Sequence, residues 1–284
     1  MIVGRAEEIE ILKNKFSSSQ SEFVAIYGRR RVGKTFLIRN VFDGKFTFRL
    51  TGMAQVNLQE QLTNFHDAIQ DQYPNPDLKK AENWKEAFRQ IELIVEKLKQ
   101  KRKVIFIDEL PWLDTMHSIF IPALEHFWNS WASARKDILL LVSGSAASWM
   151  INKLINNKGG LHNRVTQKLR IEPFTLMECN ELLINKKISL EHYQLIQLYM
   201  VLGGIPFYWD AVEKGRSAAQ NIDKLCFTRN GLLTNEFDNL FRSLFTKAER
   251  HEAVISTLAK KSKGLTRDEI SSGSKLANGG GLTR

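Results

Sequence analysis

The segment at residues 28–35 reads GRRRVGKT, and it constrains the fold of this chain more than any other feature. Gly28 and Gly33 permit backbone conformations that aim several N–H groups at one point, where an anion can bind. Lys34 and Thr35 add a positive charge and a hydroxyl within the same turn. The segment therefore predicts a loop that binds phosphate groups.

The residues around this loop have the order that such a site requires. An apolar run at Glu22–Tyr27 comes directly before it and predicts a β-strand, and Thr35–Phe42 directly after it predicts a helix. The positive end of that helix would face the bound anion. A glycine-containing surface turn is the alternative, and the strand–loop–helix context disfavours it.

The loop pattern predicts specific contacts with a nucleotide. Lys34 would lie against the β- and γ-phosphates, and the Thr35 hydroxyl would coordinate Mg²⁺. Because the backbone amides of such a loop bind the phosphates, the three arginine side chains either are solvated or contact a partner. The residues expected to contact the nucleotide are Gly28, Arg29, Arg30, Arg31, Val32, Gly33, Lys34, Thr35 and Phe36.

Strand-like and helical segments alternate from the N-terminus to about residue 172. Strands are predicted at Glu22–Tyr27, Phe46–Leu50, Val104–Ile107, Ile138–Val142 and Lys168–Ile171. Helices are predicted at Leu58–Gln72, Trp84–Gln100, Ile119–Ala134 and Ala146–Asn156. This alternation indicates an α/β fold in which helices cover both faces of a mostly parallel sheet. Helical signals dominate afterwards, so we expect a core at residues 1–172, a helical lid at 173–242 and a third segment at 243–284.

The strand predicted at Val104–Ile107 ends in two carboxylates, Asp108 and Glu109. Asp108 is expected to hold the Mg²⁺ shell opposite Thr35, and Glu109 is expected to act as the general base for an attacking water. The alternative is a strand that simply ends in exposed acids. Because the phosphate loop lies upstream, the catalytic interpretation is favoured.

Two serines follow the strand predicted at Ile138–Val142. A polar side chain at this position can orient the attacking water, and the sequence does not distinguish between Ser143 and Ser145 for that role. Ser145 is equally suited to cap the helix predicted at Ala146–Asn156.

The formal net charge of +10 favours anionic partners such as nucleotides or nucleic acid. Basic clusters occur at Arg29–Arg31, Lys97–Lys103 and Lys260–Lys263, and a solvated helix end explains the second cluster equally well. The apolar runs are too short to cross a bilayer and no signal segment opens the chain, so we expect a cytoplasmic protein without membrane contact. Cys179 and Cys226 lack metal-ligand spacing and are expected to be buried thiols.

Four motifs are similar to those of one ATPase family: GRRRVGKT, VIFIDELPWL, LLVSGSAASWM and GGIPFYW. On these motifs the chain resembles the prokaryotic archaeal-type ATPases of the STAND group, which are related to AAA+ proteins. The resemblance implies a P-loop NTPase fold with sheet order 5-1-4-3-2, followed by a helical lid and a winged helix. It also implies ATP and Mg²⁺ as cofactors.

The resemblance further implies roles for residues outside the two central motifs. The residues expected to border the adenine base are Val3, Gly4 and Arg5, which match the family's opening motif. Gly204 and Pro206 match a GxP element that packs on the nucleotide from the lid. Both the GxP role and a plain helix break at this point are compatible with the sequence.

Arg164 belongs to a Leu-His-Asn-Arg segment that matches the family's LxGR pattern, except that Asn163 replaces the usual glycine. Arg164 would then be a sensor or an arginine finger for the γ-phosphate, or else it would form an ordinary salt bridge. Since asparagine tolerates left-handed backbone angles, the turn at Asn163 can be retained.

The C-terminal part resembles the beginning of a winged helix, with an amphipathic segment at Ala248–Ala259 and a short helix that a capping box opens near Thr266. A second turn at Asn278–Gly281 leads to Leu282–Arg284, where the chain stops before a recognition helix is complete. We therefore expect either a truncated chain or a family member that ends early. DNA is a candidate partner through this region.

These motifs predict an ATP-binding, slowly hydrolysing ATPase that acts as a nucleotide-dependent regulatory switch. The alternative is a DNA-binding regulator or mobile-element helper in which ATP drives assembly. A GTPase is disfavoured because no NKxD motif occurs, and an ABC transporter ATPase because the LSGGQ-like signature is missing. ATP, ADP, a protein partner and a second copy of the chain are the expected partners.

Overall fold

The computed structural model describes residues 2–73, 78–157, 159–236 and 248–276. The chain divides into two compact units. The first comprises Met1–Ser189 and Leu202–Asp210, and the second comprises Leu190–Val201 and Ala211–Arg284. None of the helices in the described ranges combines the length and the apolar character needed to cross a bilayer.

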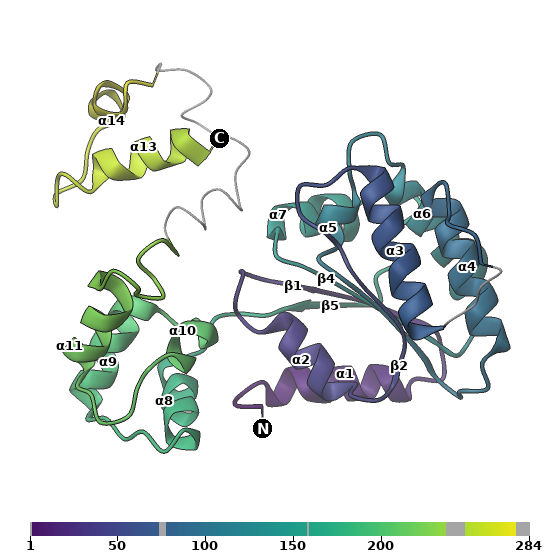
Figure 1. Ribbon diagram of the computed structural model, residues 1–284, viewed down its shortest axis with the longest axis horizontal. Helices are drawn as coiled ribbons and strands as arrows, with labels where there is room; N and C mark the ends of the chain where they lie inside the picture. The colour runs from purple at the N-terminus through teal and green to yellow at the C-terminus, as the bar shows by residue number, and fades with distance from the viewer. Residues whose placement is uncertain (1, 74–77, 158, 237–247, 277–284) are drawn as a thin grey trace. The chain divides into compact units, whose positions relative to one another are not determined.

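The first unit is built on a parallel five-stranded sheet (Figure 1). The strands are β1 (Glu22–Tyr27), β2 (Phe46–Thr51), β3 (Lys103–Asp108), β4 (Ile138–Gly144) and β5 (Gln167–Arg170). Their spatial order is β2-β3-β4-β1-β5, which confirms the order 5-1-4-3-2 that the family resemblance implied. Because all the pairings are parallel, the carboxyl ends of the strands meet at one edge and their amino ends at the other.

Alternate residues of each strand belong to two separate cores. In β1, Phe23 and Ala25 belong to one buried cluster, whereas Val24 and Ile26 belong to the other. The helices that contribute to the first cluster are α3 (Leu58–Gln72), α4 (Trp84–Lys97) and α6 (Phe120–Phe127), and those that contribute to the second are α1 (Ala6–Ser17) and α2 (Lys34–Val41). Figure 1 shows these two groups of helices on opposite faces of the sheet, as the alternating pattern predicted.

Two of the predicted helices are divided. The segment Ile119–Ala134 forms α6 followed by a π-helical turn, η1 (Trp128–Ala132). The segment Ala146–Asn156 forms α7 (Ala147–Trp149) followed by a second π-helical turn, η2 (Met150–Ile155). The sheet and its flanking helices are otherwise placed as the sequence predicted.

The residues after β3 turn away from the strand at once. Pro111 lies in the first turn of a short helix, α5 (Leu110–Leu113), which begins directly after Glu109. Proline has no N–H group to continue a sheet but fits the first turn of a helix, so it favours the end of the strand here. The two acidic residues therefore lie at the very end of β3.

The second unit is helical in the described residues. Its elements are α9 (His192–Leu202, whose last residue belongs to the first unit), α11 (Ala218–Ile222), the π-helical turn η3 (Asp223–Phe227), α13 (Ala248–Leu258) and α14 (Arg267–Ser274). The capping box predicted for α14 is present, formed by Thr266 and Glu269. The predicted turn at Asn278–Gly281 and the end at Leu282–Arg284 lie outside the described residues, and the winged helix stays a prediction.

The first compact unit continues beyond residue 172. It includes α8 (Leu176–Asn185) and α10 (Pro206–Asp210), which pack against each other. The backbone N–H of Phe174 also donates to the carbonyl of Gly204, at 2.6 Å. The predicted lid boundary at 173 therefore does not coincide with the division into compact units, because these hydrogen bonds and helix contacts tie the beginning of the predicted lid to the core.

Candidate nucleotide-binding site

The phosphate loop joins the end of β1 to the start of α2, at the carboxyl edge of the sheet. Gly28 has a φ of 153°, and a Cβ atom there would lie 2.2 Å from the carbonyl oxygen of Ile171, which leaves room only for glycine. Gly33 has a φ of 91° and precedes α2 without supplying a side-chain cap. An α-helix start without such a cap is the arrangement that binds anions.

Lys34 is turned into the loop and is only 5% exposed. Its Nζ donates to the carbonyl oxygens of Gly28 (3.0 Å) and Arg29 (2.9 Å) and to Ser145 Oγ (3.0 Å). Burial lowers the pKa of the ammonium group, and the nearby charges of Glu109 and Asp108 oppose this effect. The loop therefore encloses a cation whose present partners are neutral oxygens.

Thr35, Asp108 and Ser143 form a second polar group beside Lys34. Thr35 Oγ1 donates to Asp108 Oδ2 at 2.7 Å, and Ser143 Oγ donates to the other carboxylate oxygen. Asp108 is 3% exposed and Ser143 is fully buried. The structure therefore brings together the two residues that the sequence assigned to Mg²⁺.

A hydroxyl and a carboxylate oxygen are suitable ligands for Mg²⁺, which binds through oxygen and retains several waters or phosphate oxygens. In the described parts of the chain, no group of three or more His, Cys, Asp or Glu side chains gathers as a complete metal site. Thr35 and Asp108 thus fit a magnesium ion that is held mainly by a bound nucleotide. They do not fit an ion held by protein alone.

Glu109 is held by Ser145. The backbone N–H of Ser145 donates to Glu109 Oε2 at 3.0 Å, and its hydroxyl donates to Oε1 at 2.5 Å. Glu109 has a left-handed backbone, with φ 50° and ψ 48°, which directs the chain from β3 into α5. The capping role considered for Ser145 is wrong, because Ala146 is the N-cap of α7 and the Ser145 hydroxyl is bonded to Glu109 instead.

A cavity of about 540 Å³ opens beside these polar residues, within the range of small-molecule sites. The phosphate loop and the start of α2 line it with Arg30, Arg31, Val32, Gly33, Lys34, Thr35, Phe36 and Leu37, together with Glu109 and Ser145. The other lining residues are mostly apolar, and we call them the apolar end of the cavity: Ile2, Val3, Arg5, Phe174, Leu182, Pro206, Phe207 and Asp210. Gly28 and Arg29 do not line the cavity, and their carbonyl oxygens bind Lys34 from behind.

Arg5 connects three segments at the apolar end of the cavity. Its Nη2 donates to the carbonyls of Glu172 (2.5 Å) and Val32 (3.4 Å), and its guanidinium lies 4.8 Å from the ring centroid of Phe174. Gly4, with a φ of 60°, does not line the cavity. The predicted base-bordering segment therefore lies beside the cavity, with Arg5 fixing its position.

Arg31 contacts the segment that follows the GxP element. Its guanidinium lies 4.7 Å from the ring centroid of Phe207 and 5.8 Å from that of Tyr208. Pro206 lines the cavity, but Gly204 does not. A Cβ atom at Gly204 would lie 1.9 Å from the Phe174 carbonyl oxygen, so this glycine allows two backbones to approach. The GxP segment separates α9 from α10, which confirms the helix break, and its contact with a nucleotide stays a prediction.

Arg164 is not near the phosphate loop of its own chain. It precedes β5 at the amino edge of the sheet, where Thr166 N–H donates to the carbonyl of Phe23. Five residues of strand separate Phe23 from Gly28, which corresponds to about 16 Å. The Arg164 side chain is exposed and forms no ion pair with any residue that the structure describes. The left-handed turn expected at Asn163 is present, with φ 55°.

Sequence reasoning missed most of the apolar end. Phe174, Leu182, Phe207 and Asp210 line the cavity, although no motif assigned them a role. Phe207 directly follows the Gly-Gly-Ile-Pro segment, and this adjacency was the only available signal. Leu182 and Asp210 belong to α8 and α10, which pack against each other, and Phe174 is held by its backbone hydrogen bond to Gly204.

A sequence profile of an ATPase domain predominantly from Archaea matches residues 2–212. The chain belongs to this family. It is 27% identical over 260 residues to the uncharacterized protein MJECL04 of Methanocaldococcus jannaschii, which covers 91% of the chain and 54% of that relative. The chain therefore spans about half the length of this relative. Over 45 residues it is 44% identical to the uncharacterized ATP-binding protein MJ0423 of the same organism, which covers 16% of the chain and 76% of that protein.

Solved structures of archaeal proteins have the same fold. The Walker-type ATPase PABY2304 of Pyrococcus abyssi matches with a TM-score of 0.61 at 15% identity, covering 96% of the chain and 88% of that protein. The Aeropyrum pernix ORC2 protein, solved as ADPNP–ADP complexes, matches with a TM-score of 0.50 at 16% identity, covering 99% and 78%. These likenesses confirm the P-loop NTPase fold, and family membership identifies the chain as an ATPase-domain protein of a predominantly archaeal family.

Proposed function

We propose that this ATPase domain binds ATP with Mg²⁺, hydrolyses it slowly and thereby acts as a nucleotide-dependent regulatory switch. The observation that carries the proposal is one hydrogen-bonded chain from Lys34 through Ser145 to Glu109, beside the Thr35–Asp108 pair. The proposed phosphate-binding lysine, the proposed general base and the proposed magnesium pair thus lie close together beside the cavity, which supports this function.

The phosphate end of the site would use groups that already point inward. Lys34 Nζ donates to neutral oxygens, and a charged phosphate oxygen would be a stronger acceptor. The N–H groups of the loop and of the first turn of α2 would hold the remaining phosphate oxygens. Bound Mg²⁺ would supply charge neutralisation at the phosphates, with Thr35 and Asp108 as its protein contacts.

The adenine base would lie at the apolar end of the cavity. Val3 supplies an aliphatic wall, and the rings of Phe174 and Phe207 supply flat surfaces on which a base can stack. Because Arg31 lies over the ring of Phe207, a shift of the phosphate loop would move this ring as well. This contact supports a coupling between phosphate occupancy and the GxP segment.

Glu109 is the proposed general base, yet both of its oxygens accept hydrogen bonds from Ser145. Hydrogen bonds to a carboxylate stabilise its charged form and so weaken it as a base. Hydrolysis would therefore require the Ser145–Glu109 contact to break. Ser145 also accepts a hydrogen bond from Lys34, so movement of Lys34 towards a bound phosphate would break that bond and weaken the Ser145–Glu109 contact. This resting contact supports slow, regulated turnover.

Arg164 would have to act from a neighbouring copy of the chain if it is an arginine finger, because it lies at the opposite edge of the sheet from its own loop. We therefore also propose that copies of the chain assemble when nucleotide is bound, so that Arg164 of one copy reaches the nucleotide of its neighbour.

Two substitutions test the proposed site. Lys34→Ala should weaken binding of a non-hydrolysable ATP analogue by about 10- to 100-fold, because it removes a charge-assisted contact with phosphate. Glu109→Gln should retain analogue binding but lower phosphate release by about 100-fold or more. Lys99→Ala is the matched control, since Lys99 is an exposed lysine remote from the cavity. Unchanged affinity in Lys34→Ala would exclude this nucleotide site, and normal turnover in Glu109→Gln would exclude Glu109 as the base.

A further inference from the structure

Several exposed cations lie at the amino edge of the sheet, in the first unit. Lys97 ends α4, Lys99 and Lys101 lie in the turn to β3, Lys136 lies in the turn to β4, and Arg164 lies in the turn to β5. We call these five residues the basic edge. The four lysines precede the neighbouring strands β3 and β4, and Arg164 precedes β5, which lies on the far side of β1 in the same sheet, so the five residues follow one edge of the sheet.

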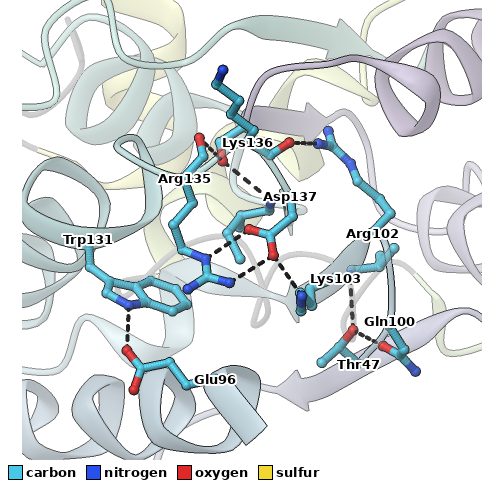
Figure 2. Close-up of polar contacts among 12 residues, drawn as sticks. Thr47, Glu96, Gln100, Arg102, Lys103, Trp131, Arg135, Lys136 and Asp137 are labelled. Atoms are coloured by element: carbon cyan, nitrogen blue, oxygen red, sulfur yellow. Dashed lines mark hydrogen bonds and ion pairs between the residues drawn. The ribbon is translucent and has the colours of Figure 1, made fainter. Parts of the chain in front are cut away.

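Two cations behind this row share one acid (Figure 2). Lys103 Nζ and the Arg135 guanidinium both bind Asp137, at 2.6 Å and 2.7 Å. Glu96 accepts a hydrogen bond from the neutral Trp131 Nε1 at 3.1 Å, which orients its carboxylate and leaves its charge in place. Lys103 and Arg135 therefore already have an acidic partner, unlike the cations of the row itself.

Arg102 links the turns that carry the lysines of this row. Its guanidinium donates to the carbonyl oxygens of Lys15 (2.8 Å), Gln20 (2.8 Å) and Lys136 (3.0 Å), which belong to three different segments of the chain. One half-buried side chain thus joins the turns that precede β1, β3 and β4. The backbones that carry the outer lysines are held at fixed spacings.

The residues of the basic edge are themselves unneutralised. Within the described part of the chain, none of the five forms an ion pair with an acidic side chain. They also lie at the opposite edge of the sheet from the phosphate loop, so a bound nucleotide cannot account for them. Their charge is available to a different anionic partner.

The surroundings of the row favour nucleic acid over an acidic protein. The core of a protein–protein interface is rich in aromatic and apolar side chains, whereas a nucleic-acid interface is polar and positive. Among the described residues, none of the large hydrophobic side chains that are exposed lies in the turns at the amino edge. The row crosses four adjacent strands, or about 14 Å at about 4.8 Å per strand. A nucleic-acid duplex carries about eight phosphate charges over that length.

We propose that the basic edge binds the phosphodiester backbone of a nucleic-acid duplex without regard to sequence. Lysines on fixed turns would contact phosphates as point charges, and no base would be read. The duplex would lie at the edge opposite the nucleotide cavity, so it could be bound with the cavity either empty or filled. This surface is distinct from the C-terminal region that the sequence suggested for DNA.

The proposal is tested with the full chain and a fluorescein-labelled duplex of about 30 base pairs, as DNA and as RNA of the same sequence. Binding is followed by fluorescence anisotropy between about 50 and 200 mM salt. The edge variant is K97Q/K99Q/K101Q. The matched control is K85Q/K187Q/K214Q, which removes the same number of exposed lysines from places outside both the basic edge and the C-terminal region. Binding of an ATP analogue, unchanged in both variants, shows that the first unit is intact.

We expect the edge variant to lose about ten-fold or more in duplex affinity at the lower salt, and the slope of log affinity against log salt to fall by up to about three. The control should stay within about two-fold of the wild type. Tighter binding of either duplex shows which nucleic acid the edge prefers, and both results support the proposal. Absent binding by the wild type, equal losses in both variants, or loss in the control alone would overturn it. Polyglutamate bound through the same lysines in place of either duplex would also overturn it and point to an acidic protein partner.

Discussion

Replacement of Ser145 by alanine is the perturbation that most directly probes the resting arrangement of the site. The substitution removes the hydroxyl that donates to Glu109 Oε1 and accepts from Lys34 Nζ. It retains the backbone N–H that donates to Glu109 Oε2. Lys34 also keeps its two carbonyl partners in the loop, so the fold of the loop should survive.

The size of the effect follows from these contacts. Hydrogen bonds to charged groups contribute about 1.5–3 kcal/mol when they are buried. Because Ser145 and Glu109 are only half-buried, we expect the loss of the Ser145 hydroxyl to destabilise the empty form by about 1–1.5 kcal/mol. In our proposal the nucleotide-bound form has already given up the Lys34–Ser145 contact. Ser145→Ala would therefore destabilise the empty form more than the bound form. Affinity for ATP and for ADP should both rise, by about five- to ten-fold.

Titration calorimetry with ADP and with a non-hydrolysable ATP analogue, each with Mg²⁺, measures this directly. The matched control is Ser143→Ala, which deletes a hydroxyl that contacts Asp108 and neither Lys34 nor Glu109. Without Mg²⁺ its nucleotide affinities should equal those of the wild type. If Ser145→Ala weakens the ATP analogue and leaves ADP unchanged, Ser145 contacts the γ-phosphate and the reasoning about a resting contact is wrong.

Two further predictions concern stability. Burial alone would raise the pKa of Asp137, but hydrogen bonds from Arg135 and Lys103 and their charges hold it at about 2, below its usual 3.8. The stability that the Asp137 ion pairs contribute is therefore complete above about pH 5 and is lost as the pH falls from about 4 to 2. The difference in urea midpoint between wild type and Asp137→Asn should shrink only in that range. A difference in midpoint that does not change with pH would contradict this prediction. Gly204→Ala should lower the thermal midpoint of the first unit, because the added Cβ would lie 1.9 Å from a backbone oxygen of Phe174, and a melt identical to the wild type would show that this approach is not required.

The sequence was sufficient for the parts of the fold that depend on neighbouring residues. The strands alternate between two cores and the loop follows its strand directly, so local patterns located β1 to β5 to within two residues at each end. The pairing of Thr35 with Asp108 was also predictable, because Asp108 ends β3 and Thr35 begins α2 just after the loop that follows β1, at the same carboxyl edge of the sheet. The helix at Ile119–Ala134 was predicted as one piece, since apolar spacing does not reveal where an α-helix gives way to a π-helical turn.

The remaining features depend on contacts between distant segments. Ser143 and Ser145 could not be distinguished, because only the twist at the end of β4 determines which hydroxyl meets Asp108 and which meets Glu109. Phe174 reaches the cavity through a backbone contact with Gly204, which no local pattern encodes. The position of Arg164 at the far edge follows from the register of β5 on β1, and a short motif carries no register information.

The Arg5 guanidinium has a practical consequence for work on this protein. It joins the opening segment, the phosphate loop and the chain after β5 at Glu172, so residues 2–5 are part of the candidate site although they lie far upstream of the phosphate loop in the sequence. An affinity tag or fusion partner that pulls on this opening segment would act like a mutation in the phosphate loop. Deleting residues 2–5 would remove the contacts that Arg5 makes with Val32, Glu172 and Phe174. Expression designs that leave the opening segment unstrained are therefore a precondition for any nucleotide measurement on the chain.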